Sequence, residues 1–167
     1  IPILKLDGYE ADDVMGTIAK QAEVQDVNVH IITGDKDILQ LLSSHVRVQL
    51  PAFRNKPDVV YDTPKFIEKY QIRPDQLVDL KALMGDSSDN IPGVRGIGEK
   101  TGTKLLLKYG TLDGIYEHLD EMKGATLRKL TEGKDLAFMS QDLAQIQVDL
   151  PVTLSLDDCL TQDFDFN

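Results

Sequence analysis

Residues 85–102 read GDSSDNIPGVRGIGEKTG and place two aspartates just before a glycine-rich turn that leads into a helix. Carboxylates attract metal ions, whereas the free backbone amides at a helix start attract anions. The glycines at 93, 96 and 98 allow positive φ angles and close approach of the backbone to another molecule. The stretch therefore predicts that a metal-binding turn adjoins an anion-binding helix start.

The glycine-rich turn has the pattern of a hairpin between two helices. Apolar Val94 and Ile97 alternate with its glycines, and its partner helix is predicted over 74–84. The pattern resembles a helix-hairpin-helix, which holds a phosphate backbone without contacting bases. The alternative is a tight turn without a ligand, and we favour binding. The candidate contacts to a phosphate backbone are Gly93, Arg95, Gly96, Gly98, Lys100, Thr101 and Lys104.

Upstream of this stretch, strands and helices alternate as far as residue 62. Apolar positions spaced three and four apart predict a helix over 10–24. The β-branched run at 27–32 is typical of a strand buried on both faces of a parallel sheet. The remaining expected elements are a strand at 1–6, a helix that begins with ILQLL at 38–42, a strand at 46–50 and a hairpin return at 58–61 after RNKP.

Beyond residue 62 the sequence predicts only helices. Thr63 followed by Pro64 is typical of a helix N-cap, and Thr111 is a second expected N-cap. Gly110 is expected to end the helix that follows the glycine-rich turn, and two more helices are predicted within 124–146. The acidic end of the chain is expected to be loosely held.

Three groups of acidic residues stand out, and each alone has an ordinary explanation as helix-dipole partners or turn residues. If the fold brings them together, their mutual repulsion requires bound cations. Carboxylates without supporting His or Cys suit hard ions such as Mg²⁺ or Mn²⁺, and we interpret His30, His45 and His118 as structural. The candidate metal ligands are Glu10, Asp12 and Asp13, Asp35 and Asp37, and Asp86 and Asp89.

Composition limits the class of protein. A chain of 167 residues with 41% hydrophobic and 28% charged residues is typical of a globular domain. No apolar run is long enough to cross a membrane and no signal peptide is evident, so we expect a cytoplasmic protein. The single Cys159 cannot form an internal disulfide. A net charge of −10 argues against nucleic acid unless bound metal reverses the local field.

The motifs GYEADD (8–13), TGDKD (33–37) and GDSSDNIPGVRGIGEKT (85–101) resemble, in order and spacing, the 5′-nuclease domain family of bacterial DNA polymerase I, which is related to flap endonucleases. The likeness covers roughly residues 1–155. It implies an α/β fold with a truncated PIN-like parallel-sheet core, followed by an all-helical helix-three-turn-helix subdomain. The expected division is 1–62, 63–150 and a tail or linker at 151–167.

The resemblance also implies roles for the candidate residues. Glu10 and Asp12 belong to a first metal site with Asp13 close by, while Asp35, Asp37 and Asp89 serve a second site that Asp86 supports. The hairpin residues contact duplex DNA with a 5′ end, nick or flap, and K⁺ is held by hairpin carbonyls, for which Val94 and Ile97 are the candidates. A polymerase domain of the same parent chain and a monomeric state are expected.

Two departures from the family pattern stand out. The family usually has alanine where Gly102 lies, and glycine costs a helix about 1 kcal/mol relative to alanine. The family's first strand with its aspartate, a further N-terminal aspartate and the basic helical arch have no counterpart here. The first metal site is therefore expected to be incomplete, and the chain is expected to cleave DNA poorly or not at all.

Two rival functions remain open from the sequence. The runner-up is a non-catalytic module in which the hairpin binds duplex DNA and the acids have no role. A phosphoryl-transfer receiver or phosphatase domain shares acids at strand ends, but it does not explain the helical half.

Overall fold

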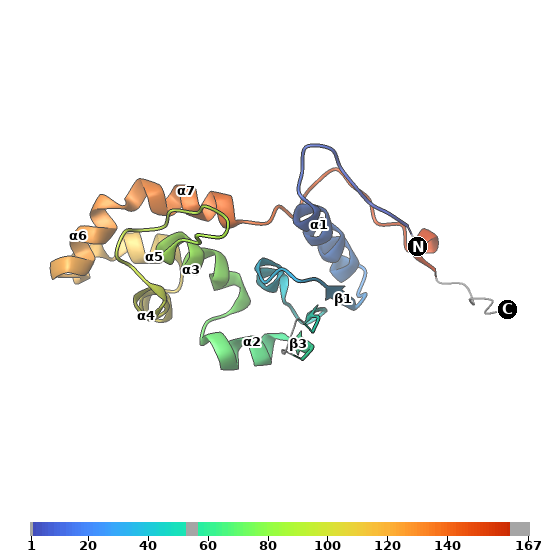
Figure 1. Ribbon diagram of the computed structural model, residues 1–167, viewed down its shortest axis with the longest axis horizontal. Helices are drawn as coiled ribbons and strands as arrows, with labels where there is room; N and C mark the ends of the chain where they lie inside the picture. Colours follow the sequence, from blue (N-terminus) through green and yellow to red (C-terminus); the bar gives the residue numbers. More distant parts are fainter. Residues whose placement is uncertain (1, 53–56, 161–167) are drawn as a thin grey trace.

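The computed structural model describes residues 2–52 and 57–160. A small sheet with helix α1 forms one part, and helices α3 to α7 form the other, with α2 between them (Figure 1). No helix among these described residues has the length and apolar character needed to cross a membrane. The elements are α1 (Ala11–Val24), β1 (Val29–Ile32), β2 (Val46–Leu50), β3 (Val59–Tyr61), α2 (Thr63–Tyr70), α3 (Leu77–Met84), α4 (Glu99–Tyr109), α5 (Leu112–Glu117), α6 (Gly124–Glu132) and α7 (Lys134–Ala144).

The sheet of the described residues has the order β1-β2-β3. Strand β1 runs parallel to β2, with Val29 opposite Val46, and β3 returns antiparallel to β2. These pairings confirm the parallel pair and the hairpin return, although residues 54–56 of the expected turn RNKP lie outside the described residues. The prediction that the first of these strands is buried on both faces is wrong, because Ile31 is 7% exposed and Ile32 is 63% exposed.

Two expected elements differ in the structure. Residues 2–6 do not form a strand, and Ile3 is 90% exposed. No described strand lies beside them to pair with their backbone groups, and an isolated strand has no stable partner for its N–H and C=O groups. The expected helix at 38–42 is a five-residue 3-10 turn, Asp37–Leu41, held by the buried Ile38 and Leu39; so short a segment favours 3-10 over α geometry.

Side-chain caps set the starts of two helices. The cap of α2 is Asp62 and not Thr63, because the Lys65 amide donates to Asp62 Oδ1 over 2.9 Å. The expected cap Thr111 is confirmed, since its Oγ1 accepts from the Gly114 amide at 3.0 Å. The predicted stop at Gly110 and both helices within 124–146 are also confirmed.

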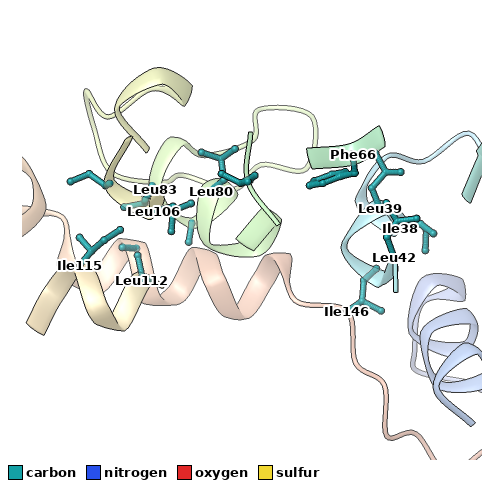
Figure 2. Close-up of a cluster of buried hydrophobic side chains, with 14 of the residues drawn as sticks. Ile38, Leu39, Leu42, Phe66, Leu80, Leu83, Leu106, Leu112, Ile115 and Ile146 are labelled. Carbon is teal, nitrogen blue, oxygen red and sulfur yellow. The ribbon is translucent and has the colours of Figure 1, made fainter. Parts of the chain in front are cut away.

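One hydrophobic core links the two parts of the molecule. Figure 2 shows Leu83 and Leu106 among the helices, Ile38 and Leu39 beside the sheet, and Phe66 between them. Gly102 of α4 is buried against α3, where an added Cβ would lie 2.8 Å from Leu80 Cδ1. Glycine therefore permits the close approach of α4 to α3, which offsets its cost in helix propensity.

The chain after α7 returns along α1 (Figure 1). The Leu150 amide donates to Thr17 Oγ1 at 3.2 Å, and the Gln21 side chain hydrogen-bonds both the Val152 carbonyl and the Leu154 amide at 2.7 Å. We call residues 145–154 the return segment. These bonds hold the backbone against α1 as far as residue 154, just before the acidic end from residue 155 that is expected to be loosely held.

Candidate functional site

Three predicted ligands converge at the junction of the two parts. One carboxylate oxygen from each of Asp37, Asp86 and Asp89 lies within 4.8 Å of the other two. Asp37 begins the 3-10 turn that follows β1, while Asp86 and Asp89 lie in the turn after α3. Asp37 thus lies beside Asp86 in the fold, although the two residues are 49 positions apart in the sequence.

Local hydrogen bonds shape the loop that carries Asp35 and Asp37. The Asp35 amide donates to Thr33 Oγ1 at 3.1 Å, and the Asp37 amide donates to Asp35 Oδ1 at 2.8 Å. Asp and Thr favour turns of this kind because their side-chain oxygens replace backbone acceptors. The motif TGDKD therefore orders its own carboxylates at the carboxyl end of β1.

The turn 85–93 is closed by its own backbone. The Asp86 amide donates to the Ile91 carbonyl at 2.9 Å, and the reverse bond from Ile91 to Asp86 is 2.8 Å. The Ser88 amide donates to Asp86 Oδ1 at 2.9 Å. These bonds fix the orientation of the Asp86 side chain, whose Oδ2 contacts a lysine.

That lysine, Lys81, is a site residue that sequence reasoning missed. Its Nζ lies 2.8 Å from Asp86 Oδ2 and 3.3 Å from Asp89 Oδ2, and it also contacts Asp37. The Lys81 side chain is only 7% exposed. A signal for it does exist in the sequence, since Lys81 is the only charged residue within 80–84 of a predicted helix, and buried lysines require partners.

The remaining predicted ligands face the same region. A cavity of about 360 Å³ is lined by six of the seven predicted carboxylates, together with residues of the turn 85–93 and the start of the return segment. Asp86 does not line this cavity and joins the others through Lys81. The acidic residues on the cavity wall are Glu10, Asp12, Asp13, Asp35, Asp37 and Asp89.

The carboxylates perturb one another. Burial raises the pKa of Asp12 above its ordinary value, and the nearby charges of Asp35, Glu10 and Asp37 raise it further. Burial also raises the pKa of Asp37, against the opposing effect of the Lys81 ammonium. Hydrogen bonds from Lys81 and Ser88 lower the pKa of Asp86 to about 2. Negative charge at this cavity is costly, as expected for a site that attracts cations.

Asp13 has a structural task in addition to its predicted one. Its Oδ2 accepts from the Glu10 amide at 3.3 Å, and its Oδ1 accepts from the Gln147 amide at 2.9 Å. It therefore joins the start of α1 to the return segment. Its predicted place near a metal stays a prediction.

The donor set suits a hard divalent cation. The predicted ligands offer oxygen atoms only, which Mg²⁺ and Mn²⁺ prefer. The histidines have other partners: His30 pairs with Gln49 at 2.9 Å, His45 with Asp26 at 3.0 Å and His118 with the Gly114 carbonyl at 2.8 Å. The histidines therefore fit the structural interpretation.

The glycine-rich turn begins directly behind the acidic turn. Gly93 is buried with φ +61°, and its amide donates to the Ser140 hydroxyl at 3.0 Å. The Val94 amide then donates to the Leu83 carbonyl at 2.8 Å. These bonds tie the hairpin to α3 and α7, so the acidic turn and the hairpin are placed together.

The hairpin presents its predicted contact residues unequally. Arg95, Gly96, Gly98, Lys100 and Lys104 are exposed, whereas Thr101 is half-buried and Gly93 is buried. Val94 and Ile97 bury their side chains, and the Ile97 amide donates to the Val94 carbonyl at 3.0 Å. Their role as K⁺ ligands stays a prediction.

Two basic residues of α6 extend the exposed positive charge of the hairpin. Lys129 Nζ donates to the Gly96 carbonyl at 2.8 Å, and both Arg128 and Lys129 line a cavity of about 490 Å³ with Arg95. Sequence reasoning missed them, because nothing in the pattern of α6 says that it packs against the hairpin.

Comparison with known families divides the chain into two matched parts. Residues 1–71 match the N-terminal resolvase-like domain of 5′-3′ exonucleases. Residues 72–167 match the C-terminal SAM fold of 5′-3′ exonucleases. The predicted boundary at residue 62 stays a prediction.

The chain is also similar to long polymerases. It is 48% identical over 164 residues to DNA polymerase I of Bacillus caldotenax, a match that covers 97% of this chain and 19% of the relative. A second match, 45% identical over 166 residues, is DNA polymerase I of Caldicellulosiruptor bescii, which covers 98% of this chain and 20% of that protein. The chain therefore spans about a fifth of the length of these curated relatives.

Among solved structures, the chain resembles the 5′-exonuclease of T5 with bound zinc, with a TM-score of 0.72 and 29% identity. That match covers 86% of this chain and 52% of the T5 chain. The shared architecture confirms the expected α/β part followed by a helical part.

Proposed function

The chain belongs to the 5′-3′ exonuclease family, and from this membership and its acidic cavity we propose that it hydrolyses phosphodiester bonds of DNA at 5′ ends, nicks or flaps with the aid of divalent metal. The observation that carries the proposal is the meeting of six carboxylates on one cavity. They come from both matched parts of the chain, and so the site exists only when the two parts are packed together.

The carboxylates divide naturally into two groups that would hold two cations. Glu10 and Asp12 lie at the start of α1, whereas Asp37 and Asp89 lie nearer to Lys81. Mg²⁺ or Mn²⁺ fits these oxygen ligands. A pair of such ions supplies the activation of water and the stabilisation of the departing oxygen that phosphodiester hydrolysis needs.

The hairpin would hold the substrate beside that cavity. Exposed Arg95, Lys100 and Lys104 and the free amides at the start of α4 suit phosphate oxygens, and they contact a backbone without reading its sequence. Because the Gly93 and Asp86 backbones belong to one closed turn, a duplex on the hairpin has its phosphates next to the acids. Duplex DNA with a 5′ end is therefore the proposed partner, and K⁺ at the hairpin and a polymerase domain in the parent chain remain parts of the proposal.

A cleavage assay tests the proposal. The parent protein is incubated with labelled nicked and 5′-flap duplexes and Mg²⁺, and binding is measured in parallel with Ca²⁺ in place of Mg²⁺. We expect Asp37→Ala and Asp89→Ala to abolish cleavage while duplex binding persists. Asp75→Ala, which removes an exposed carboxylate paired with Arg73, is the matched control and should cleave normally.

The rival function predicts the opposite result. If the chain only binds duplex DNA, any cleavage by the protein arises elsewhere, and both Asp37→Ala and Asp89→Ala leave it unchanged. Cleavage that is unaffected by either substitution would refute the nuclease proposal.

A further inference from the structure

Lys81 lies at the inner side of the acidic group. Its side chain is 7% exposed, whereas the side chains of Asp37, Asp86 and Asp89 are 24%, 21% and 49% exposed. The ammonium thus approaches the carboxylates from within the protein, along α3. The carboxylates remain open to solvent on their other side.

The ammonium uses the same oxygen atoms that a cation would use. Lys81 has three N–H donors and contacts three carboxylates. These are the carboxylates whose oxygens gather within 4.8 Å of one another. The group formed by Glu10 and Asp12 differs, since among the described residues no lysine or arginine forms an ion pair with either of them, and the charges that act on Asp12 are all carboxylates.

We propose that Lys81 is an internal counter-ion, which holds Asp37, Asp86 and Asp89 together in the metal-free protein and which a divalent ion must displace from them. The inference rests on the metal binding proposed above. Metal binding at Asp37, Asp86 and Asp89 is weakened by this competition, because the carboxylates can bind the entering ion only when they release the Lys81 ammonium. The half formed by Glu10 and Asp12 carries no such competitor.

The competing explanation is a purely structural ion pair. In that case Lys81 stabilises the fold, and its loss leaves three carboxylates without a partner. Metal affinity would then be unchanged, or it would fall because the ligands lose their arrangement. A competitor and a structural partner therefore predict opposite changes in metal affinity.

Calorimetric titration of Mn²⁺ into the chain separates these cases. We expect Lys81→Met to lower the dissociation constant of Mn²⁺ at the site formed by Asp37, Asp86 and Asp89 by about tenfold or more. The reason is that the substitution removes a positive charge in contact with these ligands. Lys36→Met is the matched control: it removes the same charge from an exposed position between Asp35 and Asp37, and we expect less than about a threefold change because solvent screens it.

A second measurement uses the unmodified protein and does not depend on the folding of a variant. Reductive methylation followed by mass spectrometry reports how accessible each lysine amine is. We expect Mg²⁺ to increase the labelling rate of Lys81 several-fold while the rate at Lys36 stays constant. A Lys81 rate that is unchanged or lower when metal is bound overturns the proposal.

The possible outcomes separate the two proposals. If Mn²⁺ binds the unsubstituted chain and Lys81→Met equally well, or binds the variant more weakly, the counter-ion role is wrong and the metal site stands. If Mn²⁺ binds neither protein at millimolar concentration, both proposals fail. Tighter binding in Lys81→Met alone, together with faster labelling of Lys81 in Mg²⁺, supports the counter-ion.

Discussion

Gly93 lies directly against Gly85, so that a Cβ on Gly93 would meet the Gly85 nitrogen at 2.2 Å. Both residues have positive φ, +75° at Gly85 and +61° at Gly93. This contact closes the neck of the turn that carries Asp86 and Asp89. It also starts the hairpin, and therefore one pair of glycines fixes the acidic turn and the candidate DNA contacts relative to each other.

The Gly85–Gly93 contact predicts that Gly93→Ala is strongly destabilising. A side chain in the left-handed region and in collision with backbone cannot be relieved by a rotamer change, so we expect a loss of about 2 kcal/mol or more in the free energy of unfolding. Gly34→Ala is the matched control, because a Cβ there meets nothing within 4 Å, and it should change stability by less than about 0.5 kcal/mol. Urea denaturation measures both, and equal stability of the two variants would contradict the prediction.

Ser140 is predicted to hold the hairpin from α7. It is fully buried and accepts the Gly93 amide at 3.0 Å. Ser140→Ala leaves that buried N–H without a partner, which should cost about 1–3 kcal/mol in thermal or chemical unfolding. Ser155→Ala, at an exposed position, is the comparison. Amide hydrogen exchange at Gly93 should accelerate in Ser140→Ala, and unchanged protection there would show that the bond has no role.

Asp79 predicts a pH dependence of stability. Burial raises its pKa, although Gln141 and the Leu112 amide donate to it at 2.6 and 3.0 Å. The folded state therefore binds a proton more tightly than the unfolded state. Protonation of Asp79 therefore adds to the free energy of unfolding. This contribution is complete below a pH of 3.8, the pKa of Asp79 in the unfolded chain, and it is lost as the pH rises through the higher pKa of the folded state.

Comparison with Asp79→Asn isolates this effect. As the pH falls from 7 toward 4, the stability of the original chain should improve relative to that of Asp79→Asn, because only the former gains a proton at this position. Urea unfolding at several pH values gives the difference directly. Parallel pH profiles for the two proteins would show that Asp79 is not the source.

The exposed bases of the hairpin predict how DNA binding depends on salt. Each phosphate contact releases counter-ions, so the logarithm of the affinity should fall linearly with the logarithm of salt concentration. Lys104→Ala should reduce the magnitude of that slope by about 0.9 if Lys104 contacts one phosphate. Fluorescence anisotropy with a labelled duplex measures the slope. Lys20→Ala, on the exposed face of α1, should leave it unchanged, and a Lys104→Ala slope equal to the original would exclude the contact.

Divalent metal is predicted to stabilise the fold. The ion relieves repulsion at the cavity, where burial and the neighbouring carboxylates Asp35, Glu10 and Asp37 raise the pKa of Asp12. A ligand present at 100 times its dissociation constant adds about 2.7 kcal/mol to the free energy of unfolding. Differential scanning calorimetry with Mn²⁺ and then with excess EDTA measures the gain and its removal. Asp12→Asn should reduce the gain, and an identical gain would place the ion elsewhere.

Local patterns accounted for most of the secondary structure. The helix at 11–24, the strand at 46–50 and the helices after residue 62 follow from apolar spacing, caps and glycine stops, all of which act within a few residues. The wrong predictions concern segments whose structure depends on a partner elsewhere or on a competing neighbour. Residues 2–6 have a strand-like alternation without a described neighbour to pair with, and Asp62 competes successfully with Thr63 for the cap of α2.

The sequence by itself determined the chemical type of the site, because carboxylates without histidine or cysteine admit only hard cations and a glycine-rich helix start admits anions. Tertiary structure decided which groups meet: it placed Lys81 among Asp37, Asp86 and Asp89, and it used Asp13 to hold the return segment. The physical reason is that residue chemistry and periodicity are local properties. Contacts between residues 40 or more positions apart depend instead on how α3, α7 and the return segment pack over the shared core.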